Sequence, residues 1–314
     1  MLPDDALVAM AGVCHRVQPL SISVYFRRVG VLTSEPGSQE LQLCRDVPAP
    51  VFRLLSFVYL ENNVHFTCDV FHLLEHEVML QKFSARTPIT SVCLQFYSNE
   101  PAVVLAPKTA GALCSFLGSL SARCISITVD TMRYYDFTPR QVSRSQRRLD
   151  NTAHIAHVKT LMSGVRRIAL TDELFRTQAL AKVGSLLLNG PHVTSFGLTC
   201  TSTRGNTILS QVNFPELRCL RISSAIAPRF PTEFFHRHSS VYVLGLFGLH
   251  EGCSQRNLSR SSRSSSRNVE LPRLAVLTFT DRFLPWVSNL VCPNVTNVAI
   301  YPSRHWETEK LVES

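Results

Sequence analysis

A short hydrophobic spacing recurs along most of the chain. In the stretch PELRCLRIS, apolar residues stand at Leu217, Leu220 and Ile222, so the second and third follow the first by three and five residues. The last two members of such a set alternate as one face of a short strand does, and the first is a turn residue just before that strand. Eight sets share this spacing: Ile89, Val92, Leu94; Cys124, Ile127, Val129; Val165, Ile168, Leu170; Val193, Phe196, Leu198; Leu217, Leu220, Ile222; Val241, Leu244, Leu246; Leu274, Leu277, Phe279; and Val295, Val298, Ile300.

The segments between these predicted strands show helical periodicity. Apolar residues fall on one side of the predicted helices, and Asn189-Gly190-Pro191 is a strong helix stop after the longest of them. One short strand cannot bury its face alone, so copies are expected to stack side by side with helical returns between them. Four sets carry a proline two residues before their first member: Pro191, Pro215, Pro272 and Pro293. The pattern therefore predicts an α/β solenoid of short parallel strands and helices.

This repeat set resembles the leucine-rich repeat family, in the irregular form seen in many fungal intracellular proteins. The L-x-x-L-x-L core of that family is matched eight times, over roughly residues 85–302. The asparagine that the family carries three residues after the last core position is missing in every copy, where Tyr97, Met132, Glu173, Thr201, Ala225, Leu249, Arg282 and Ser303 stand instead. A non-repetitive α/β domain is the alternative interpretation.

The N-terminus resembles an F-box. Its pieces are Leu2-Pro3-Asp4-Asp5, then Leu7 and Met10, then Val13-Cys14-His15-Arg16, then Val24-Tyr25-Phe26-Arg27-Arg28. Pro3 suits the first turn of a helix, and two aspartates favour its positive end. Ten residues separate Pro3 from Cys14, about half the family's usual number, so we interpret the segment as a shortened F-box.

The two resemblances together imply a domain order and a role. Residues 1–29 would be the F-box-like segment, residues 30–84 lead-in strands and a helix, and residues 85–314 the solenoid. An F-box docks on the Skp-type adaptor of a cullin–RING ubiquitin ligase, here through Leu2, Pro3, Asp4 and Leu7, and the repeats select a protein substrate. The alternative is a ligase-independent binding module.

A partner is expected on the strand face opposite the core. The residues at the fourth and sixth positions after each first member lie there. Those that we select as candidate partner contacts are Arg221, Ser223, Thr278, Thr280 and Tyr301.

The net charge of +9 comes mainly from two arginine tracts, near residues 136–150 and 251–269. The second tract has a low-complexity Ser/Arg composition, and both tracts lie within long intervals between successive hydrophobic sets. We therefore expect both to be solvated loop insertions in the solenoid. No aromatic residues are interleaved with the arginines of these tracts, which argues against specific nucleic-acid binding.

The most apolar window, residues 101–120, contains two prolines and Lys108 and is a poor membrane span. Ten cysteines without a C-x-x-C pair, and no recognisable signal sequence, indicate a reducing compartment, either cytoplasm or nucleus.

One enzyme signature occurs. HLLEH at His72–His76 matches the inverted zinc-peptidase motif, in which two histidines bind zinc and Glu75 activates water. A zinc site of this kind needs a third protein ligand, which the motif's family supplies as a glutamate well downstream. No glutamate occurs between Glu100 and Glu173. We therefore expect an ordinary amphipathic helix, packed through Phe71, Leu74 and Val78. The sequence predicts a non-enzymatic interaction protein without metal or cofactor, with the zinc peptidase as a remote alternative.

Overall fold

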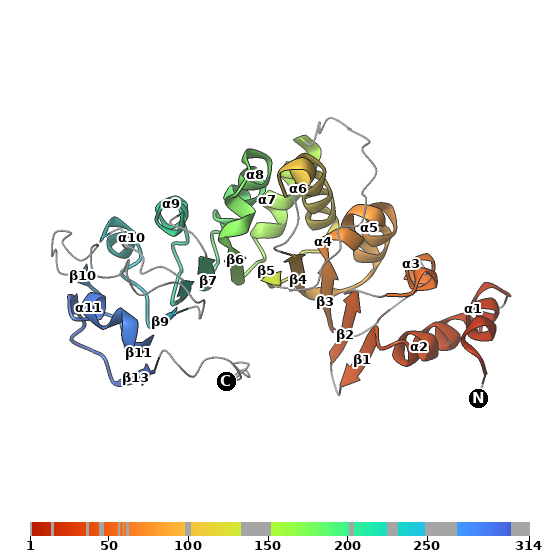
Figure 1. Ribbon diagram of the computed structural model, residues 1–314, viewed down its shortest axis with the longest axis horizontal. Coiled ribbons are helices and arrows are strands. Elements are labelled where there is room, and N and C mark those ends of the chain that lie inside the picture. The colour runs from red at the N-terminus through yellow and green to blue at the C-terminus, as the bar shows by residue number, and fades with distance from the viewer. Residues whose placement is uncertain are drawn as a thin grey trace. The chain divides into compact units, whose positions relative to one another are not determined.

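The computed structural model describes residues 2–13, 16–35, 38–43, 47–55, 57–58, 60, 63–97, 102–132, 152–200, 204–224, 232–248 and 269–302 (Figure 1). The chain forms two compact units. The first comprises Met1–Val165 and Thr177–Leu186, and the second Arg166–Arg176 and Leu187–Ser314. Both predicted arginine-rich insertions lie outside the described residues, apart from Val269 at the end of the second.

The first unit begins with two packed helices and continues as a ladder of strands. The N-terminal helix pair is α1 (Asp4–Val13) and α2 (Gln18–Arg28). Strand β1 (Leu32–Glu35) pairs antiparallel with β2 (Ser38–Leu43). From β2 the strands run parallel in sequence order, through β3 (Asn63–Asp69) and β4 (Ile89–Tyr97) to β5 (Ser126–Met132). The helices of this unit are α3 (Ala49–Leu55), α4 (Val70–Glu75), α5 (Glu77–Arg86), α6 (Ala102–Ser119), α7 (Thr152–Met162) and α8 (Gln178–Leu187).

The second unit is a ladder of parallel strands in sequence order. These are β6 (Arg167–Thr171), β7 (Ser195–Cys200), β8 (Cys219–Ser224), β9 (Val243–Gly248), β11 (Val276–Thr280) and β13 (Asn297–Tyr301). A second, two-stranded sheet pairs β10 (Val269–Glu270) with β12 (Leu290–Val291). Short helices return the chain between strands: η1 (Asp172–Phe175), α9 (Gly205–Gln211), α10 (Thr232–Arg237), η3 (Asp281–Phe283) and α11 (Leu284–Val287).

The predicted fold class is confirmed. Each of the eight hydrophobic sets lies on a parallel strand or on the turn that leads into it. In the first seven sets every member is at most 5% exposed, so these side chains form the core behind each ladder. Because the strands are parallel, stacked in sequence order and linked by helical returns, each unit is a stretch of α/β solenoid.

The prolines before the repeats occupy tight turns. The amide of Leu217 donates to the carbonyl oxygen of Phe214 at 3.0 Å, and that of Leu274 donates to Leu271 at 3.2 Å. Pro215 and Pro272 are therefore the second residue of a four-residue turn, where a φ fixed near −65° is favourable. After this turn, the amides of Arg218 and Cys219 both donate to the oxygen of Thr194 in the preceding repeat, at 2.9 Å each.

The hydrophobic spacing did not predict two strands of the ladder, β2 and β3. Phe66 and Cys68 of β3 pair with Val92 and Leu94 of β4, so they occupy the core positions of a repeat. The residue of β3 that pairs with Ile89, the first member of the β4 set, is the buried Val64, and the register shifts between Val64 and His65. The first member therefore lies two residues before Phe66, where the pattern requires three. In β2 the position three residues before Leu41 is the polar Ser38. A pattern that requires an apolar residue at this fixed spacing misses both strands.

Threonine side chains supply loop hydrogen bonds in two repeats. The hydroxyl of Thr280, at the end of β11, accepts from the amide of Gly248 at 3.0 Å. Thr171 holds the same position in β6 and accepts from the amide of Glu173 at 3.5 Å. Both threonines are 0% exposed. They anchor the loops at strand ends whose repeats lack the asparagine of regular repeats.

The described helices include none that is long and apolar enough to cross a membrane.

The seven described cysteines carry free thiols, and four of them, Cys68, Cys114, Cys124 and Cys200, are buried. Burial raises the pKa of Cys124 and of Cys200 to about 12. Both thiols therefore stay protonated and act as small apolar core groups.

Candidate functional site

The second unit presents a strand face made of the side chains that alternate with its core. We call this the exposed strand face. Its members are mostly uncharged, and all but the buried Gly245 are partly or fully exposed: Arg167, Ala169, Ser195, Gly197, Thr199, Cys219, Arg221, Ser223, Val243, Gly245, Phe247, Val276, Thr278, Asn297, Ala299 and Tyr301. Consecutive strands lie side by side in register, so these residues form continuous rows across the ladder.

The middle row of this face consists of small side chains except at one residue. Register places Ala169, Gly197, Arg221, Gly245, Thr278 and Ala299 in line, one on each strand. Arg221 is the long side chain of the row, and it stands between two glycines. A Cβ at Gly245 would lie 3.4 Å from Cγ of Arg221 and 2.8 Å from Cε2 of Phe247. The arginine stem and the phenyl ring therefore occupy the space that a larger residue would fill.

Arg221 is exposed, and among the described residues its guanidinium makes no hydrogen bond and no ion pair. The ion pairs of Glu216 lie elsewhere, at the turns before the strands, with His192 at 3.1 Å and Arg166 at 3.9 Å. A guanidinium presents five donors in a planar fork that matches a carboxylate. The middle row is thus a shallow surface with one cationic, multidentate donor.

The structure separates the five candidate partner contacts into two groups. Arg221 is exposed, Tyr301 is 39% exposed, and Ser223 and Thr278 are partly exposed. Thr280 is fully buried because its hydroxyl holds the Gly248 amide, so it offers no contact surface. Phe247 and the two glycines beside Arg221 complete this face. Sequence reasoning missed them because their importance depends on strand register.

The candidate adaptor contacts on the N-terminal helix pair differ in their exposure to solvent. Leu2 is 51% exposed and Pro3 is also exposed, whereas Leu7 is 5% exposed and packs inside the pair. A carboxylate oxygen of Asp4 forms an ion pair with Arg28 of α2 at 2.9 Å, and the same guanidinium donates to the carbonyl of Leu2. Two further exposed apolar residues, Val13 at 86% and Leu20 at 67%, were not selected from the sequence.

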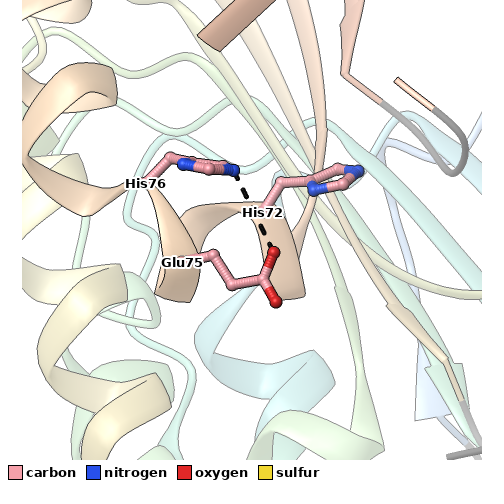
Figure 2. A group of neighbouring side chains, drawn as sticks. All are labelled: His72, Glu75 and His76. Atoms are coloured by element: carbon pink, nitrogen blue, oxygen red, sulfur yellow. Dashed lines mark ion pairs between the residues drawn. The ribbon is translucent and has the colours of Figure 1, made fainter. Parts of the chain in front are cut away.

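The HLLEH segment spans a break between two helices (Figure 2). Helix α4 ends at Glu75, and α5 begins at Glu77. His76 between them has φ −122° and ψ 25°, although its amide still donates to the carbonyl of His72 at 2.9 Å.

The expected packing through Val78 is wrong, because Val78 is 60% exposed. The break changes the helical phase, and the buried residues are instead His72, Leu73, Leu80 and Phe83.

The three polar side chains of this segment cluster together. One ligand atom from each of His72, Glu75 and His76 lies within 4.8 Å of the others. Phe52 of α3 stacks on the His76 ring at 3.8 Å between centroids and tilts against the His72 ring at 4.8 Å. Burial lowers the pKa of His76, and the neighbouring Glu75 partly opposes this. The cluster therefore has a neutral imidazole beside a carboxylate near pH 7.

Comparisons with known proteins add a structural likeness. No protein-family model matches the sequence, and no curated protein matches it. The leucine-rich repeat-containing protein LegL7 from Legionella pneumophila is similar in structure, with a TM-score of 0.45 and 11% identity. That match covers 84% of this chain and 90% of LegL7. The solenoid assignment rests on the strand order, the register and the repeated turns described above.

Proposed function

We propose that this chain is a non-enzymatic protein-interaction protein that binds its partner on the exposed strand face of the second unit. The observation that carries the proposal is the exposed Arg221 guanidinium, which stands between two glycines and has no acidic partner among the described residues. A parallel ladder whose core side chains are buried from β6 to β11 supports such a surface rigidly. The small neighbours leave the guanidinium accessible to a group on another protein.

The surface chemistry favours a protein with an acidic side chain at the contact. Arg221 can bind a carboxylate through two parallel hydrogen bonds, and Phe247, Val243 and Val276 offer apolar area beside it. Ser223 and Thr278 add hydroxyl groups that donate or accept. Arginine flanked by aromatic and apolar surface is typical of the residues that dominate binding energy at interfaces.

Charge reversal tests this proposal. We expect Arg221→Glu to weaken partner capture by at least about tenfold, because it replaces an attractive charge with a repulsive one. Arg273→Glu is the matched control, since Arg273 is an exposed arginine in a turn of the same unit. The measurement is quantitative pull-down of partners on the immobilised full chain, with folding of both variants checked by circular dichroism. Equal loss in both variants, or loss in neither, would contradict the proposal.

We further propose that the N-terminal helix pair links this binding surface to a Skp-type adaptor of a cullin–RING ubiquitin ligase, in the cytoplasm or nucleus. The F-box resemblance motivates this role, and the exposed Leu2 and Pro3 are the residues available for contact. Asp4 would orient the N-terminal residues through Arg28, and Leu7 would pack the pair from inside.

The adaptor proposal has its own test. We expect the full chain to bind a recombinant Skp-type adaptor, and Leu2→Asp to weaken that binding by about tenfold because it places a charge in an apolar contact. Arg86→Asp, at an exposed position in the same unit, should bind normally. Biolayer interferometry supplies the affinities. A full chain that captures partners but not the adaptor would establish the alternative, a ligase-independent binding module.

A further inference from the structure

We propose that His72, Glu75 and His76 form a binding site for a divalent transition-metal ion, with Zn²⁺ the best fit. This inference is independent of the proposed partner surface and adaptor contact. Two imidazole nitrogens and one carboxylate oxygen are already within 4.8 Å of one another. Nitrogen and oxygen ligands of these kinds suit Zn²⁺, Co²⁺ and Ni²⁺.

The backbone brings the three residues together before any ion binds. His72 and Glu75 lie on the last turn of α4, and His76 follows directly. The hydrogen bond from the His76 amide to the His72 carbonyl closes that turn, while the His76 carbonyl accepts from Met79 and Leu80 at 3.0 Å each. The ligands therefore belong to one short, hydrogen-bonded segment whose bend is part of the fold.

The imidazole rings are held by aromatic packing. Phe52 is 3% exposed; it stacks on the His76 ring with 20° between planes and lies tilted by 47° against the His72 ring. The centroids of the two histidine rings are 6.3 Å apart with 27° between planes. Stacking on its face leaves the nitrogen-bearing edge of the His76 ring toward the Glu75 carboxylate. Figure 2 shows the His76 ring nitrogen opposite the Glu75 carboxylate, with 4.0 Å between Nε2 and the nearer carboxylate oxygen.

The present spacing needs a modest closure. Zinc–ligand bonds of about 2.0–2.2 Å in a tetrahedron put ligand atoms roughly 3.5 Å apart. Glu75 can supply this movement because its side chain is 45% exposed, and His76 is 31% exposed, so an ion can reach them from solvent. Three protein ligands leave a position for water. An ion bound here would fix the bend between α4 and α5.

This geometry differs from that of the inverted zinc-peptidase motif, which the same five residues match in sequence. In that motif Glu75 stays off the metal and activates water. Here the Glu75 carboxylate lies in the same cluster as the two histidine nitrogens and takes the third ligand position. We therefore assign the site to metal binding and leave the chain non-enzymatic.

Cobalt titration of the chelator-stripped full chain tests the site. We expect one equivalent of Co²⁺ to produce visible absorption bands of a four- or five-coordinate ion, and Zn²⁺ to displace them. His76→Phe keeps a ring on Phe52 but removes a ligand, and Glu75→Gln removes the carboxylate; each should weaken Co²⁺ binding by about tenfold or more. Their matched controls, His65→Ala and Glu77→Gln, remove one imidazole and one carboxylate elsewhere in the same unit.

A second measurement covers the case in which a variant changes the local fold. Zn²⁺ should raise the melting midpoint of the natural chain and of both controls, and should raise that of His76→Phe and Glu75→Gln by less. Absence of stoichiometric Co²⁺ binding by the natural chain overturns the proposal. Unchanged binding in both ligand variants also overturns it, because the ion would then lie at other side chains.

Discussion

Leu220→Ala is expected to lower the free energy of unfolding of the second unit by about 2–5 kcal/mol. Leu220 is 0% exposed, and register places it between Phe196 on β7 and Leu244 on β9, which are also 0% exposed. Truncation removes buried apolar atoms and leaves a cavity that rigid neighbouring strands cannot fill. Urea unfolding followed by far-ultraviolet circular dichroism measures the change.

Val298→Ala is the matched comparison, because Val298 holds the same repeat position on β13. It is 54% exposed, and Ile300 beside it is 57% exposed. Strand β13 has β11 on one side and is the last strand of the described ladder. We expect a loss of less than about 1 kcal/mol, since half of the side chain is already in water. Similar losses for both substitutions would refute the assignment of the core.

His238→Leu is expected to destabilise the second unit by about 1–3 kcal/mol at pH 7. The ring is 3% exposed and bridges two repeats. Its Nδ1 donates to the carbonyl of Phe234 at 2.8 Å, and its Nε2 accepts from the amide of Phe214 at 3.4 Å. Leucine cannot make either bond, so the buried Phe214 amide would lose its acceptor. His236→Leu, at an exposed position on the preceding helix α10, should cost little.

The same bridge predicts a pH dependence with a definite sign. Burial lowers the pKa of His238, partly opposed by the bond to Phe234 and reinforced by Arg237. Below about pH 6.5 the unfolded chain therefore binds more protons at this residue than the folded chain. Stability that is present above pH 6.5 is lost as the pH falls.

Urea midpoints between pH 7.5 and 5 should therefore fall more steeply for the natural chain than for His238→Leu. His76, whose pKa burial also lowers, is present in both proteins and cancels in this comparison. Parallel slopes would contradict the role of the bridge.

The repeats could be predicted because their physics is local. A strand buried on one face needs apolar residues at alternate positions, and a turn before it favours proline, so eight strands could be placed from spacing alone. Strands β2 and β3 could not. Ser38 is polar where the pattern needs an apolar residue in β2, and a register shift in β3 brings Val64 to within two residues of Phe66. The exposure of Val298 likewise depends on what lies beside β13.

The candidate surfaces show the same limit. Alternation placed Arg221, Ser223 and Thr278 on the strand face opposite the core. It could not reveal that Thr280 turns inward to hold Gly248, or that Gly245 makes room for Phe247. The helix break at His76 was also hidden, because HLLEHEVML reads as one continuous amphipathic helix. The clustering of Glu75 with the two histidines is visible only in three dimensions.

The role of the exposed strand face is the central claim, and site-specific photo-crosslinking tests it most directly. A photoreactive amino acid would replace Ser223 or Thr278 on this face, and Thr207, exposed on α9 of the same unit, as control. We predict that one partner protein crosslinks from both strand positions, that Arg221→Glu abolishes these crosslinks, and that Thr207 gives none. Crosslinking of that partner from Thr207 alone, or from the strand positions irrespective of Arg221→Glu, would contradict the claim.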